Sequence, residues 1–129
     1  MNSFLGHQTT VDFYGCHEER INSSNYIKKV LLQAAKMMNL SVVNAIIHEF
    51  SPIGVSGVIV IEESHIAIHT WPEHNYVAID FFTCGKSYDL VEGIDWLAKE
   101  FQAKKVTQSQ EKRGNLQEVK KHTLVTNGH

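Results

Sequence analysis

Reactive side chains gather in one segment of this sequence, between Glu62 and Cys84. Serine and cysteine can act as nucleophiles, histidine transfers protons near neutral pH, and carboxylates accept hydrogen bonds. The candidate side chains of this segment are Glu62, Glu63, Ser64, His65, His69, Thr70, Trp71, Glu73, His74, Asp80, Thr83 and Cys84. Three kinds of site can be considered: a metal centre, a hydrolase nucleophile and a self-cleaving serine.

A metal centre is the first alternative, because His65 and His69 are four residues apart. That spacing brings two ligands together on a helix. Here the pattern HIAIHTWP predicts a strand, in which four residues span about 13 Å. The sequence also has no CxxC pair. We therefore expect no metal, although a hydrolase that uses His65 and His69 to hold one remains an alternative.

A serine or cysteine hydrolase is the second alternative. Ser64 lacks the GxSxG sequence of a nucleophile elbow, and Cys84, followed by Gly85, lacks a cysteine-protease signature. Spacing alone leaves this alternative open.

Self-cleavage at Ser64 is the third alternative. A serine that follows an acidic turn can attack the preceding carbonyl in an N-to-O acyl shift, if the peptide bond is strained or activated. A nearby group must move protons and a donor must hold the oxyanion. We expect His69 to be the nearest proton-transfer group. Elimination of the ester would then convert Ser64 into a pyruvoyl group.

The elements that must position these residues can be read from apolar periodicity. Ser23 or Ser24 can cap a helix whose apolar stripe contains Ile27, Val30, Leu31, Ala34, Ala35 and Met38. Strands are expected at 9–14, 42–50, 54–63, 65–72, 76–84 and 104–114, and a second helix at 87–101. The order β-α-β-β-β-β-α-β predicts an α+β fold. We expect a two-layer sandwich, with a mostly antiparallel sheet and both helices on one face.

The segments around VIVI and YVAIDFF are apolar on both faces, which predicts that a second sheet, from an identical chain, covers the other face. Beyond Gly114 the pattern fades, so residues 115–129 are expected to form a tail.

Composition narrows the function classes. The chain has 129 residues and a formal net charge of -2, which argues against nucleic-acid binding. The sequence shows neither a signal peptide nor a membrane span, so we expect a cytoplasmic protein. Cys16 and Cys84 are then expected to be free thiols, with Cys16 in the core.

Several motifs in order resemble one known family. The segment from Glu63 to Glu73 reads ESHIAIHTWPE and the segment from Phe81 to Gly85 reads FFTCG. Three further matches are YGC at 14–16, FSPIGVSGVIVI at 50–61 and KRG at 112–114. Together they resemble prokaryotic S-adenosylmethionine decarboxylase proenzymes over residues 6–114.

This resemblance implies roles for individual residues. The bond between Glu63 and Ser64 would break without a protease, giving a β chain, 1–63, and an α chain, 64–129. Ser64 would become the covalent pyruvoyl cofactor, which forms a Schiff base with the substrate. His69 would transfer protons during processing, with support from Ser56, and Cys84 would protonate the product carbon.

The resemblance also implies a substrate and a partner. S-adenosylmethionine would lose carbon dioxide to give the aminopropyl donor for spermidine synthesis. Phe50 and Trp71 are candidates to stack on the substrate, and Glu73 could bind its ribose hydroxyls. The family fold pairs two protomers through their sheets, with active sites at the interface. A pyruvoyl decarboxylase of ornithine or arginine, or a homologue that never cleaves, remains an alternative.

Overall fold

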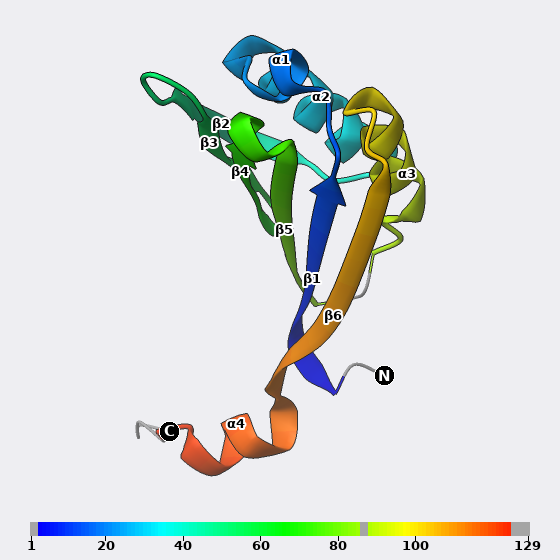
Figure 1. Ribbon diagram of the computed structural model, residues 1–129. Helices are drawn as coiled ribbons and strands as arrows, with labels where there is room; N and C mark the ends of the chain where they lie inside the picture. The colour runs from blue at the N-terminus through cyan, green and yellow to red at the C-terminus, as the bar shows by residue number, and fades with distance from the viewer. Residues whose placement is uncertain (1–2, 86–87, 125–129) are drawn as a thin grey trace.

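A six-stranded antiparallel sheet carries helices on one of its faces (Figure 1). The computed structural model describes residues 3–85 and 88–124. In chain order the elements are β1 (Phe4–Tyr14), α1 (Glu18–Ile21), α2 (Ser24–Met37), β2 (Val42–Glu49), β3 (Val55–Ile61), β4 (Ser64–Trp71), the 3-10 helix η1 (Pro72–His74), β5 (Tyr76–Cys84), α3 (Val91–Glu100), β6 (Lys105–Asn115) and α4 (Leu116–His122). The strands lie side by side in the order β2-β3-β4-β5-β1-β6.

The predicted α+β sandwich is confirmed, but its predicted element order is incomplete. The structure adds the single-turn helix α1, the 3-10 helix η1 and the C-terminal helix α4. Residues 116–122 of the predicted tail form α4, which lies beyond the end of the sheet opposite α1 (Figure 1). The last five residues of that predicted tail, 125–129, and Ser87 of the predicted second helix lie outside the described residues.

Helix α2 follows from its cap and its apolar stripe. The Ser23 hydroxyl accepts a hydrogen bond from the Tyr26 amide at 3.2 Å, which satisfies one amide of the first turn. The buried residues of α2 are Ile27, Val30, Leu31, Ala34 and Ala35, as the periodicity predicts. At Gly93 of α3 an added Cβ would overlap the side chain of Met38. The missing side chain therefore lets α3 approach the end of α2.

Alternation along the strands gives the sheet two different faces. In β4 the side chains of Ile66, Ile68 and Thr70 are buried beneath the helices, whereas those between them point to the opposite face. We call this second face, which no helix of the described chain covers, the open face. Its exposed apolar side chains include Tyr14, Ile46, Val58, Val60 and Trp71.

Strand register determines which residues of the open face are neighbours. One cross-strand row contains Val60, His65, Phe82 and Gln8. A second row, toward the other end of β4, contains His48, Ser56, His69, Ala78 and Asp12. The open face therefore displays polar and apolar side chains in fixed rows.

Removing a core aromatic side chain tests the layer contact. Phe13 of β1 is fully buried and meets Phe101 edge to face, with ring centroids 5.3 Å apart. We expect Phe13→Ala to lower the free energy of unfolding by about 3–5 kcal/mol, measured by urea denaturation at fixed protein concentration. Leu5→Ala, on the same strand but at a side chain that is 51% exposed, should cost at most about 1 kcal/mol. Equal losses would contradict the assignment of the core.

Candidate active site

A two-residue turn places the bond between Glu63 and Ser64 at the end of the sheet. Ile61 of β3 pairs with Ser64 of β4, so Glu62 and Glu63 form the turn between them. The Glu62 amide donates to the Ser41 carbonyl at 2.8 Å, and the Ser41 amide donates to Glu63 Oε1 at 3.0 Å. These two bonds tie the turn to the residue before β2 and hold its position.

The carbonyl of the same peptide bond has a defined donor. The backbone N–H of Cys84 donates to the Glu63 carbonyl oxygen at 2.7 Å. That donor aims at the oxygen that gains negative charge when a nucleophile adds to the carbonyl carbon. The peptide bond before Ser64 therefore has a hydrogen-bond donor in place at its carbonyl oxygen.

Ser64 has a second polar neighbour besides this carbonyl. Its Oγ lies 3.5 Å from His65 Nδ1, the outer limit of a hydrogen bond. The His65 ring stacks on Phe82, with centroids 5.7 Å apart and planes 11° apart. Ser64, His65 and Cys84 thus form a first group of functional side chains at one end of β4 and β5.

The two cysteines are free, as predicted, but their environments differ. Cys84 is exposed at the end of β5. Cys16 is buried, its thiol donates to the Phe13 carbonyl at 3.5 Å, and burial raises its pKa to about 11. Cys84 is therefore the thiol that a substrate can reach.

A second group of functional side chains lies toward the other end of the open face. Ser56 of β3 and His69 of β4 are cross-strand partners, and Ser56 Oγ lies 2.7 Å from His69 Nδ1. Beyond them Trp71 stacks on Tyr76 with centroids 5.3 Å apart, and Tyr76 stacks on Tyr14 at 5.4 Å.

These aromatic side chains also form a hollow. Tyr14, Trp71, His74 and Tyr76 line a shallow cavity of about 340 Å³. The Tyr76 hydroxyl donates to Asp12, and burial together with this bond raises the pKa of Tyr76. Of these four side chains only Trp71 was predicted from the sequence to contact the substrate, because the partners of a stacked row become known only from strand register.

The predicted substrate contacts lie near this second group. Phe50 follows β2, is 49% exposed and meets the His48 ring edge to face at 4.6 Å. Glu73 is exposed in η1, two residues after Trp71. Both side chains are open to a ligand. Neither residue is a cross-strand partner of Ser64.

The two groups are separated along β4. Five residues of strand place His69 roughly 16 Å from Ser64, and seven place Trp71 roughly 23 Å away. Within one protomer the histidine beside the Ser64 hydroxyl is therefore His65, and the role of His69 in processing stays a prediction. The sequence pattern missed this because a regular strand points adjacent side chains to opposite faces.

The described residues contain no cluster of three or more histidine, cysteine or acidic side chains that could hold a metal ion. Within the same residues no helix has the length and apolar character to cross a membrane.

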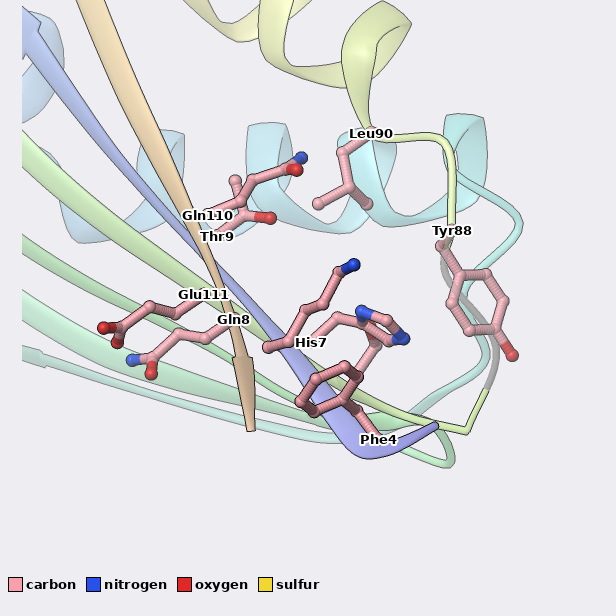
Figure 2. A pocket seen from close by; sticks show the side chains of 10 residues that line it. Phe4, His7, Gln8, Thr9, Tyr88, Leu90, Gln110 and Glu111 are labelled. Carbon is pink, nitrogen blue, oxygen red and sulfur yellow. The ribbon is translucent and has the colours of Figure 1, made fainter. Parts of the chain in front are cut away.

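A separate cavity of about 680 Å³ lies between β1, β6 and the segment before α3. Figure 2 shows Phe4, His7, Tyr88 and Leu90 around it. His7 Nε2 is buried there without a hydrogen-bond partner in the described chain. The cavity is lined by Thr83, the cross-strand partner of Ser64, but not by Ser64, His69 or Cys84.

Comparisons with known proteins agree with the resemblance in sequence. Residues 7–114 match the family model described as S-adenosylmethionine decarboxylase. An S-adenosylmethionine decarboxylase proenzyme of Acetivibrio thermocellus is 42% identical over 114 residues, which are 88% of this chain and 92% of that protein. The proenzyme of Pyrococcus horikoshii is 40% identical over 124 residues, covering 95% of this chain and 89% of that protein.

A solved structure supports the same assignment. The crystal structure of the adenosylmethionine decarboxylase from Aquifex aeolicus is similar to this fold with a TM-score of 0.79 and 31% identity. The match covers 88% of this chain and 93% of that one. By sequence and by fold, the chain belongs to the S-adenosylmethionine decarboxylase family.

Proposed function

We propose that this chain cleaves itself between Glu63 and Ser64 and then decarboxylates S-adenosylmethionine. The observation that carries the proposal is the hydrogen bond from the Cys84 N–H to the Glu63 carbonyl, beside the Ser64 hydroxyl. A nucleophile, its electrophile and an oxyanion donor therefore meet at one peptide bond. The relatives named as proenzymes favour the same reaction.

Self-cleavage at this bond needs only groups of the chain. The Ser64 hydroxyl oxygen adds to the Glu63 carbonyl carbon, and the carbon–nitrogen bond breaks to leave an ester. Loss of the Ser64 α-proton then expels the Glu63 carboxylate, and hydrolysis with loss of ammonia leaves a pyruvoyl group on residue 64. The pyruvoyl carbonyl supplies an electron-withdrawing centre for decarboxylation.

Two copies of the chain would bring the separated groups together. The open face presents apolar side chains that no element of the described chain covers, including Ile46 at 66% exposure. A two-fold dimer uses the same surface of both copies. Each contact between a residue of one copy and a residue of the other therefore occurs twice. If the axis passes near the middle of β4, Ser64 and Cys84 of one copy face Ser56 and His69 of its partner.

Different residues of the chain then carry out processing, substrate binding and protonation. His69, held by Ser56 at 2.7 Å, transfers protons during processing. Trp71 and Phe50 offer exposed rings for the adenine and the sulfonium of the substrate. Glu73 accepts hydrogen bonds from the ribose hydroxyls. Cys84 donates a proton to the substrate carbon that loses carbon dioxide.

Replacing Ser64 tests the cleavage. The wild-type precursor of 14.6 kDa should give way to two fragments, 1–63 and 64–129, on a denaturing gel and by intact mass. Ser64→Ala lacks the attacking oxygen and should stay whole. Carbon dioxide should be released from S-adenosylmethionine and not from ornithine or arginine. A wild-type chain that persists uncut with an ordinary amino terminus would overturn the proposal.

Mixed dimers test whether the site is shared between two copies. We expect His69→Ala alone to stay uncut. When it is co-expressed with Ser64→Ala, its own Ser64 can meet the intact His69 of the other chain. The His69→Ala chain should then be cut, as judged by intact mass.

The matched control for this experiment replaces Ser64→Ala with the double variant Ser64→Ala/His69→Ala, which supplies no intact His69. No cleavage is expected in that mixture. A His69→Ala chain that stays whole inside purified mixed dimers would contradict the interfacial site.

Cys84→Ala separates the two contributions of this residue. It keeps the backbone N–H at the Glu63 carbonyl, so the two fragments should form at a rate close to that of the wild type. It removes the thiol, so carbon dioxide release should fall by about 10²–10⁴-fold. Equal loss of cleavage and decarboxylation would contradict this division.

The control for Cys84→Ala is Cys16→Ala, which should retain decarboxylation because Cys16 is buried. Alkylation of the native protein at pH 8 should modify Cys84 and spare Cys16. The raised pKa of Cys16, about 11, keeps that thiol protonated at this pH, and protein atoms cover it. Peptide mass analysis distinguishes the two sites.

A further inference from the structure

We infer that His65 accepts the Ser64 hydroxyl proton in the first step of self-cleavage. The inference rests on the proposed cleavage between Glu63 and Ser64 and assigns one proton transfer within it. His65 Nδ1 lies 3.5 Å from Ser64 Oγ, the atom that must lose its proton on attack. Catalytic hydrogen bonds are often this long before the reacting groups close up.

The local backbone explains why two adjacent residues meet. In a regular strand the side chains of residues 64 and 65 would point to opposite faces of the sheet. Ser64 departs from that geometry, with a φ of +157° at the point where the turn enters β4. At this position its hydroxyl oxygen lies 3.5 Å from the imidazole Nδ1 of the next residue.

Neighbouring strands fix the imidazole in this place. Phe82 of β5 stacks on the ring at 5.7 Å, and Val60 of β3 is its cross-strand partner on the other side. The ring is half-buried. Its neighbours therefore restrict its rotation, and part of it still contacts water. The titratable side chains on the adjoining strands and turn of this region are Asp80, Cys84, Glu62 and Glu63.

His69 is a poor candidate for this particular proton. It lies roughly 16 Å along β4 from Ser64, and its Nδ1 already contacts Ser56 Oγ at 2.7 Å. Self-cleavage removes two protons, first from the Ser64 hydroxyl and later from the Ser64 α-carbon. Assigning the first to His65 of the same chain leaves the second to His69, which the proposed dimer supplies.

The step balances without any added reagent. The Ser64 Oγ–H bond breaks, its proton moves to His65 Nδ1, and the Oγ–carbon bond to Glu63 forms while the Cys84 N–H holds the oxyanion. The carbon–nitrogen bond then breaks, and the protonated imidazole returns the proton to the departing nitrogen of Ser64. The product is an ester between Glu63 and Ser64, with a free amine on Ser64.

His65→Phe in the full-length precursor tests the inference, because phenylalanine can still stack on Phe82 but has no ring nitrogen. The readouts are the first-order rate of fragment formation and the amount of ester, which hydroxylamine cleaves. We expect cleavage to slow by about 10²-fold or more, with no accumulated ester. His122→Phe, a substitution at an exposed histidine of α4, is the matched control and should cleave at the wild-type rate.

Two further variants keep the test decisive if His65→Phe folds poorly. His65→Asn retains a hydrogen-bond acceptor but no base and should be slow, with an unfolding temperature close to that of the wild type. His65→Ala should be accelerated by added imidazole, whereas Ser64→Ala should not respond.

Several results would overturn the inference. They are His65 variants that cut at the wild-type rate, variants that accumulate ester sensitive to hydroxylamine, or a folded His65→Ala chain that imidazole leaves unchanged. A wild-type chain that never cuts would instead remove the proposed function itself. The two failures are therefore distinguishable from the wild-type sample alone.

Discussion

The alternating geometry of the β-strand is the constraint on which this structure depends. Buried side chains such as Ile66 and Ile68 fix β4 against the helices, and this commits the residues between them to the open face. A slip of one residue would place His65 and His69 in the core and expose the isoleucines. The apolar packing of one face therefore determines the positions of the functional side chains on the other.

The fold class could be predicted because local patterns and long-range packing agree in most of the chain. The stripe on α2 and the cap at Ser23 were visible in the sequence, and so were the apolar runs of β3 and β5. The strand β6 was predicted at 104–114 although its sequence is largely polar, and all of its residues are exposed. Helix α4 was missed, since the only helix signal there is the Asn115 cap, which accepts from two amides, and a few apolar side chains.

The site was harder to predict than the fold, because its geometry depends on contacts that residue types do not encode. A resemblance to a family pointed to Ser64, His69 and Cys84, and the predicted strand over 65–72 already implied that the first and second lie far apart. Neither showed that His65 lies beside the Ser64 hydroxyl. The hydrogen bond to the Glu63 carbonyl comes from the backbone N–H of Cys84, which any residue except proline would provide. A sequence motif therefore cannot identify this donor. The contact between Ser64 and His65 depends on one backbone angle that alternation would not suggest.

Strand order has a consequence for the protein once residues 63 and 64 are no longer joined. One polypeptide would then contain β1, β2 and β3, and the other β4, β5 and β6. In the sheet β1 lies between β5 and β6, and β3 remains paired with β4. The strands of the two polypeptides are thus interleaved in one sheet, and separating the polypeptides would break three strand pairings. A cut at this turn would therefore open the backbone at one point while the product stays a single folded body.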